Sequence, residues 1–166
     1  MADYLNQQEA VQIREPASLG SLLYISRSTI APEEAEAVVA GIVATSVTRN
    51  AAVGLTGALL FTGTHFAQAL EGDKAAIEDL MHRVTCDIRH DEIVIVEQGP
   101  LEQRRFDTWS MAYFGPSQFV SRHVTRLLND PSPAERRRAA DWLGELLCEF
   151  TARRPFPTLI EQPSIP

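Results

Sequence analysis

The chain has 166 residues, of which 45% are hydrophobic and 22% charged, a composition typical of one soluble globular domain with appendages. Its formal net charge of -7 argues against a direct nucleic-acid partner, because binding to a phosphate backbone requires a basic face. No apolar run approaches the roughly 18 residues of a membrane span and residues 1–18 contain no signal peptide, so we expect a cytoplasmic protein without a membrane partner.

The first predicted elements are an arm, a strand and a helix. Residues 1–18 are expected to form a polar N-terminal arm, and "SLLYISRS" (21–28) is predicted to be a strand. The next residues, "APEE", indicate a helix start with Pro32 in the first turn and acidic residues that complement the helix dipole. This helix is predicted to end near Asn50.

The inward face of this predicted helix changes from apolar to polar residues towards its C-terminal end. Its apolar stripe includes Val39 and Ile42 and continues at helical spacing into Ser46 and Asn50. Polar residues therefore replace apolar ones at the C-terminal end of a face that should contact the core.

Residues 53–72 are predicted to form two strands joined by a short turn at 62–64, a hairpin. In the second strand, "THFAQALEG", alternation places Phe66, Gln68 and Leu70 on one face. That face should be buried, and a buried amide without partners costs roughly 1–3 kcal/mol. We therefore expect Gln68 to be paired by protein, by water or by a ligand.

The rest of the chain is predicted to hold four more elements and a tail. Asp73 can cap a second helix whose stripe is Ile77, Leu80, Met81 and Val84. Strands are predicted at 92–99 and 107–115, and amphipathic helices at 117–130 and 132–150. The expected stripes of these last two helices are Phe119, His123 and Leu127, then Leu143, Leu146, Leu147 and Phe150. The proline-rich tail is assigned to 151–166, and its stretch "PFPTLIEQPSIP" (155–166) is predicted to be coil.

The order of these elements predicts the α+β class, as a ferredoxin-like sandwich (βαββαβ plus a fifth strand) with two C-terminal capping helices. The first and third strands of that fold are its central pair. Tyr24, Leu60 and Gln68 are expected on the face that the first two helices cover. The opposite face is expected to carry Leu23, Ile25, Leu59, Phe61, Val94 and Val96. Residues 116–150 are predicted to cap that second face.

Four polar residues, Tyr24, Ser46, Asn50 and Gln68, are therefore predicted to converge beneath the groove between the first two helices. Each has an ordinary structural explanation alone, such as a backbone acceptor for the phenol or a helix-end carbonyl for Ser46 and Asn50. Together they suggest a site for a planar ligand with many acceptors.

Other chemistry has weaker support. His65, His82, His90 and His123 lack ligand spacing with cysteines or carboxylates, so we expect no metal site. Arg104 and Arg105 are interpreted as a solvated loop, with a partner surface as the alternative.

Five segments in order resemble the BLUF family, flavin-binding sensors of blue light: "LLYISRS", "TSVTRNAAVGLTGALLF", "FAQALEG", "DIRHDEI" and "RRFDTWSMAY". The resemblance covers residues 19–115 and implies FAD as the cofactor, with FMN or riboflavin as alternatives. It implies photoactive roles for Tyr24, Gln68, Trp109 and Met111. It implies flavin binding by Tyr24, Ile42, Ser46, Asn50, Gln68, Val84, Arg89 and His90. The chain departs from the family in Val84, where isoleucine is frequent, and carries Arg49 at a variable position.

The resemblance also implies how such a protein works. Blue light drives electron and proton transfer from Tyr24 to the flavin, and the hydrogen bonds of Gln68 then rearrange. The residues after 115 are expected to be too few for a cyclase or phosphodiesterase domain, so we expect no enzyme activity. The signal is expected to leave through the fifth strand and the C-terminal helices, towards a separate effector or regulator protein or within a homo-oligomer. The alternatives are an acylphosphatase-like enzyme and a colourless ligand-sensing or dimerisation module.

Overall fold

The computed structural model describes residues 19–114, 118–129 and 132–153, and gives the backbone alone for 109–114, 118, 119 and 153. The predicted arm and the predicted tail beyond Arg153 lie outside the described residues. The first three residues assigned to the tail, 151–153, instead continue the last helix. The elements in chain order are β1 (Leu19–Ser28), α1 (Ala35–Ala52), β2 (Thr56–Phe61), β3 (His65–Asp73), α2 (Lys74–Thr85), β4 (His90–Pro100), β5 (Trp109–Phe114), α3 (Gln118–Leu128) and α4 (Pro133–Arg153).

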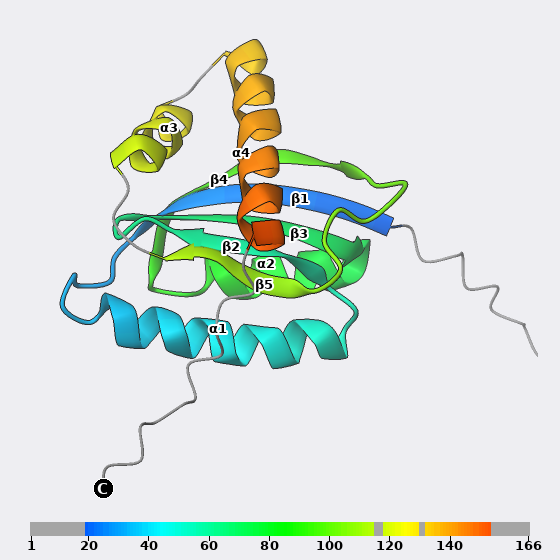
Figure 1. The fold of residues 1–166 in the computed structure, drawn as a ribbon, viewed down its shortest axis with the longest axis horizontal. Helices are drawn as coiled ribbons and strands as arrows, with labels where there is room; N and C mark the ends of the chain where they lie inside the picture. The colour runs from blue at the N-terminus through cyan, green and yellow to red at the C-terminus, as the bar shows by residue number, and fades with distance from the viewer. Residues whose placement is uncertain (1–18, 115–117, 130–131, 154–166) are drawn as a thin grey trace, which may run out of the picture.

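These strands form one sheet in the order β4-β1-β3-β2-β5. All neighbours are antiparallel except β2 and β5, which are parallel. The predicted fold class and the central position of β1 and β3 are confirmed. Helices α1 and α2 lie below the sheet in Figure 1, and α3 and α4 lie above it.

The pairing of the central strands decides which residues share a face. Tyr24 pairs with Gln68, and Gln68 pairs with Leu59 on its other side. Directly paired residues lie on the same face of a sheet, so these three side chains form one row. The predicted placement of Leu59 and Phe61 opposite Tyr24 is therefore wrong. Leu60, predicted beside Tyr24, belongs to the opposite face.

The face that carries Tyr24 is closed by α1 and α2. Its buried core consists of Leu22, Tyr24, Ala35, Val39, Leu55, Leu59, Phe61, Phe66, Leu70, Ile77 and Met81. Asp73 caps α2 as predicted, because its carboxylate accepts a hydrogen bond from the Ala75 N–H at 2.9 Å. Helix α1 begins at Ala35, so Pro32 lies in the turn that precedes the helix rather than in its first turn.

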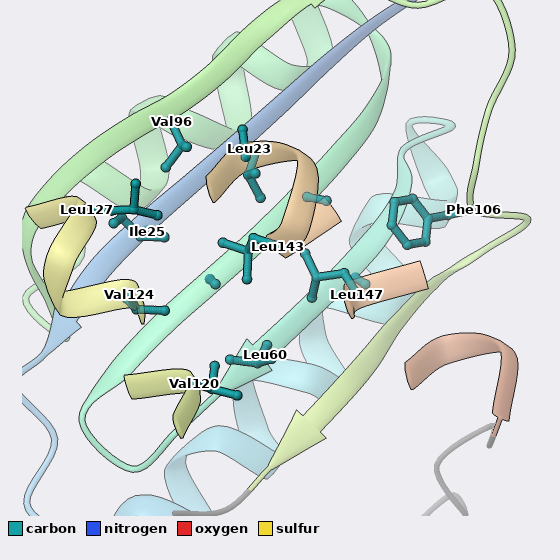
Figure 2. Packing of buried hydrophobic residues seen from close by; sticks show 14 residues of the cluster. Leu23, Ile25, Leu60, Val96, Phe106, Val120, Val124, Leu127, Leu143 and Leu147 are labelled. Atoms are coloured by element: carbon teal, nitrogen blue, oxygen red, sulfur yellow. The ribbon is translucent and has the colours of Figure 1, made fainter. Parts of the chain in front are cut away.

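The opposite face is closed by α3 and α4, as predicted. Figure 2 shows Leu143 and Leu147 of α4 and Val120, Val124 and Leu127 of α3 above the sheet residues Leu23, Ile25, Leu60 and Val96. The buried stripe of α3 differs from the predicted one, since Val120 and Val124 take the place of His123. The His123 ring is half-buried and stacks on Trp142, with the ring centroids 4.5 Å apart. The predicted contribution of Phe119 lies outside the described side chains.

The loop between β4 and β5 is fastened to the sheet by two arginines and one buried carboxylate. Arg104 donates hydrogen bonds to the carbonyls of Gly54 and Glu71 and to the Thr56 hydroxyl, at 2.6–2.8 Å. The fully buried Glu71 carboxylate accepts from the backbone and Nε of Arg105, at 2.8 and 3.0 Å, and from the backbone of Phe106 at 3.2 Å. The interpretation of Arg104 and Arg105 as a solvated loop holds in part, since Arg105 is exposed, but both side chains also tie this loop to its neighbours.

Two negative observations concern the described part of the chain. None of its helices is long and apolar enough to cross a membrane. Its histidines, cysteines and carboxylates form no group of three or more that could hold a metal ion.

Candidate functional site

Two buried side chains of the sheet, joined by a hydrogen bond, lie at the base of the candidate site. The Tyr24 hydroxyl donates to Gln68 Oε1 at 2.7 Å, and the two residues are 1% and 5% exposed. Their facing positions on β1 and β3 hold them in register. The phenol is therefore one of the partners that a buried amide at position 68 requires.

Tyr24 is a hydrogen-bond donor across the physiological pH range. Burial raises the pKa of its phenol well above the ordinary value, and the negative charge of Asp87 raises this pKa further. The neutral phenol can therefore donate to Gln68 at any pH at which the protein works.

Asn50 supplies a second buried amide with a different environment. It lies in the last turn of α1, where its backbone carbonyl accepts from the N–H groups of Val53 and Leu55 at 3.2 and 2.9 Å. The side chain is 1% exposed, and neither its oxygen nor its nitrogen has a hydrogen-bond partner within the described residues. A buried amide in this state is destabilising unless a ligand or water completes its hydrogen bonds, so Asn50 points to a ligand.

These residues line a pocket of about 160 Å³ between α1 and α2. All eight residues predicted to bind a cofactor line it: Tyr24, Ile42, Ser46, Asn50, Gln68, Val84, Arg89 and His90. The lining residues that the sequence interpretation did not assign to the site are Gly41, Thr45, Arg49, Leu59, Phe66, Leu80, Arg83 and Asp87. Helical spacing from Ile42 through Thr45 and Ser46 to Arg49 is the signal that could have identified two of these.

The segment after α2 forms one end of the pocket. Arg89 Nε donates to both oxygens of Asp87, at 2.8 and 3.1 Å, which holds the pKa of this carboxyl below its usual range. His90, at the start of β4, shares a hydrogen bond of 2.8 Å between its Nδ1 and the Ser26 hydroxyl. Burial lowers the pKa of His90, so its ring is neutral near pH 7 and packs on Phe66 with the ring centroids 4.5 Å apart.

Trp109 and Met111 lie in β5, where their backbones pair with Gly57 and Leu59 of β2. Their side chains lie outside the described part of the structure. The photoactive roles that the resemblance implies for these two residues therefore stay predictions.

The donor set of the pocket suits a flavin. The pocket between the two helices is lined by one phenol and two amides, each amide offering a donor and an acceptor. An isoalloxazine ring presents an edge of carbonyls and ring nitrogens that such amides can match. The partnerless Asn50 side chain fits this edge, and Ile42, Leu80 and Val84 supply apolar surface for the ring faces.

Replacement of Asn50 by Ala is expected to have opposite effects on the flavin-free and flavin-bound protein. Flavin affinity should fall about tenfold or more, because the ring loses a buried partner. The flavin-free chain should keep or gain stability, because it loses a buried amide that lacks hydrogen bonds. Thermal unfolding without flavin measures the stability of the flavin-free chain, and the increase in melting temperature on adding flavin reports the affinity. Equal destabilisation of the two forms would identify Asn50 as a structural residue instead.

Comparison with known proteins gives a consistent result. A family model described as "BLUF: Sensors of blue-light using FAD" matches residues 19–112, more than half of the chain. Photoactivated adenylate cyclase subunit beta of Euglena gracilis is 28% identical over 97 residues, which cover 58% of this chain and 11% of that protein. Subunit alpha from the same organism is 31% identical over 94 residues, 56% of this chain and 9% of that protein.

Solved structures match over a larger share of the chain. The dark-state structure of BlrB, a BLUF protein, is 31% identical with a TM-score of 0.60, covering 82% of this chain and 98% of that one. The BlrP1 BLUF structure is 25% identical with a TM-score of 0.55, covering 76% of this chain and 90% of that one.

Proposed function

This chain belongs to the BLUF family, sensors of blue light using FAD, and from that membership we propose that it binds a flavin between α1 and α2 and reports light through Tyr24 and Gln68. The chain spans about a tenth of the length of the curated cyclase subunits that it matches. The cyclase activity in their names is therefore not transferred to it, and we assign the described residues no catalytic role.

The observation that carries the proposal is the buried hydrogen bond from Tyr24 to Gln68. A tyrosine is an electron and proton donor, and at 2.7 Å its proton already points at the amide oxygen. Within the described residues this amide has no other hydrogen-bond partner, so its nitrogen is free to meet a ligand in the pocket. Tyr24, Gln68 and the pocket thus form a continuous path for a proton.

A bound flavin would supply the absorption of blue light and an acceptor for an electron and a proton. The chain's own residues perform the remaining steps. When the Tyr24 hydroxyl gives up its proton, it changes from donor to acceptor. The Gln68 amide can then turn so that its nitrogen donates to Tyr24 and its oxygen points into the pocket. When the proton returns, the phenol oxygen can still accept from the Gln68 nitrogen, so the turned amide can persist with its oxygen, an acceptor, facing the pocket.

We propose FAD as the resident flavin, with FMN or riboflavin as alternatives. Asn50 and Gln68 would bind the ring edge, while Ile42 and Val84 would pack against its faces from the two helices. Ser46 and the Arg89–His90 segment complete the lining. These assignments rest on the position of each side chain in the pocket and on the family's residue pattern.

The proposed output runs through the sheet to α3 and α4. Tyr24 is flanked in β1 by Leu23 and Ile25, which belong to the core beneath these helices (Figure 2). A movement of the β1 backbone at Tyr24 would therefore also move Leu23 and Ile25, which contact the core on the opposite face of the sheet. The receiving partner would be a separate effector or regulator protein, or a second copy of this chain in a homo-oligomer.

Gln68→Leu tests the proposal directly. The variant should fold and retain flavin, because leucine fills a similar volume beside Leu59 and Leu70. The reversible red shift of the flavin absorption band under blue light should disappear, because leucine has no amide to turn. Absorption spectra before and after illumination measure this. A normal shift in Gln68→Leu would place the switch elsewhere, and a wild-type protein that stays colourless after flavin is added would end the photoreceptor assignment.

A further inference from the structure

The rim of the pocket differs in charge from its floor. Arg49 of α1 and Arg83 of α2 both line the pocket and are exposed, whereas Tyr24, Asn50 and Gln68 are buried at its base. Arg49 stands two turns after Ile42, and Arg83 one turn after Leu80, so each belongs to the stripe that its helix turns to the pocket. Two guanidinium groups therefore face the entrance from opposite walls.

Neither Arg49 nor Arg83 forms an ion pair with a carboxylate in the described part of the chain. The third arginine of the lining, Arg89, is held by Asp87. Within residues 19–114, 118–129 and 132–153, Arg49 and Arg83 take part in no ion pair, although Asp79 lies one turn before Arg83. The entrance thus carries two unpaired positive charges on a chain whose formal net charge is -7.

We propose that Arg49 and Arg83 bind the phosphate of the flavin's side chain, so that this protein selects FMN and FAD over riboflavin. The inference rests on the proposed flavin binding. With the ring edge held by the amides at the pocket floor, the ribityl chain extends towards the rim. It ends there in a hydroxyl in riboflavin and in a phosphate in FMN and FAD. Guanidinium groups bind phosphate through paired, charge-assisted hydrogen bonds, which a hydroxyl cannot replace.

A structural explanation of the two arginines makes a different prediction. Both lie in the last turn of their helices, where a cation interacts favourably with the helix dipole. If that were their whole role, their removal would lower stability slightly and leave the choice of flavin unchanged.

A competition experiment on the full chain separates these readings. The protein is equilibrated with equal concentrations of riboflavin and FMN, freed of unbound flavin and denatured, and the released flavins are quantified by chromatography. We expect about a tenfold excess of FMN from the wild type and a ratio near one from the double variant Arg49→Gln, Arg83→Gln. The excess should also shrink at high salt, because the arginines are exposed and the Debye length falls from about 10 Å at 0.1 M to about 3 Å at 1 M.

Two controls complete the test. Arg137→Gln removes the same charge from an exposed site on α4 away from the pocket, and should keep the wild-type ratio. The double variant Arg49→Lys, Arg83→Lys keeps the charge but not the paired hydrogen bonds, and should give an excess of FMN between those of the wild type and the glutamine variant. Equal amounts of the two flavins from the wild type, or an unchanged excess in the glutamine variant, would overturn this inference alone. A wild-type protein that retains neither flavin would overturn the proposed function and this inference together.

Discussion

Tyr24→Phe should abolish the light-induced spectral shift while leaving flavin affinity within about threefold of the wild type. The phenyl ring keeps the volume of a side chain that is almost fully buried, so the core beneath α1 and α2 stays packed. The change removes the hydroxyl that donates to Gln68 at 2.7 Å, a loss of about 1 kcal/mol in stability. It also removes the proton on which the proposed mechanism depends. Spectra during a cycle of blue light and darkness measure the shift.

A matched control removes a different buried hydroxyl from the same strand. Ser26 is fully buried and shares a hydrogen bond with His90, but does not line the pocket. Ser26→Ala should therefore retain the spectral shift at a similar small cost in stability. An unchanged photocycle in Tyr24→Phe, or the loss of the shift in both variants, would contradict the role assigned to Tyr24.

Glu71→Gln should lower the free energy of unfolding by about 3 kcal/mol, the largest effect on stability that we expect from a single conservative change. The Glu71 carboxylate accepts three hydrogen bonds from Arg105 and Phe106 and is fully buried. A glutamine amide keeps one oxygen and turns an NH₂ group towards donors. The Arg105 charge also loses its partner. Chemical denaturation followed by circular dichroism measures the change.

Glu97→Gln is the control for this prediction. Glu97 is exposed on β4, so the same chemical change should alter stability by less than about 0.5 kcal/mol. A loss in Glu71→Gln no larger than in Glu97→Gln would show that the loop between β4 and β5 does not depend on the buried carboxylate.

The elements and the centre of the site could be predicted because their signals are local. Alternation in β3 separated Gln68 from Ala67 and Ala69, and helical spacing in α1 placed Asn50 on the inward face. The order of the elements then identified β1 and β3 as the central strands. That order brings Tyr24 to Gln68 although they are 44 positions apart in the sequence.

The register of β2 could not be predicted in the same way. The run from Ala58 to Phe61 is apolar at every position, so period-two alternation gives no signal. Its faces are decided by pairing with β3, where Leu59 meets Gln68 and Phe61 meets Phe66. The buried stripe of α3 was mispredicted because two neighbouring residues are both at least partly buried: His123 stacks on Trp142 of α4, and Val124 lies in the core.

The role of Glu71 was also beyond the sequence patterns. Its partners Arg105 and Phe106 lie 34 and 35 positions later, in a loop without regular periodicity. Nothing local distinguishes this carboxylate from a solvated one at a strand end. Interactions of this kind follow from the tertiary fold, which places the loop after β4 beside the end of β3.

Strand β4 ends one side of the sheet, and its outer backbone groups face no other strand of the five described. An open edge is a template for aggregation unless irregular backbone or charge prevents strand addition. The register of β4 against β1 shifts at two places, Glu92 has a left-handed backbone with φ of 48°, and Glu97 is exposed. A straight strand from another molecule is a poor match for this bent and charged edge, so β4 is protected from strand addition.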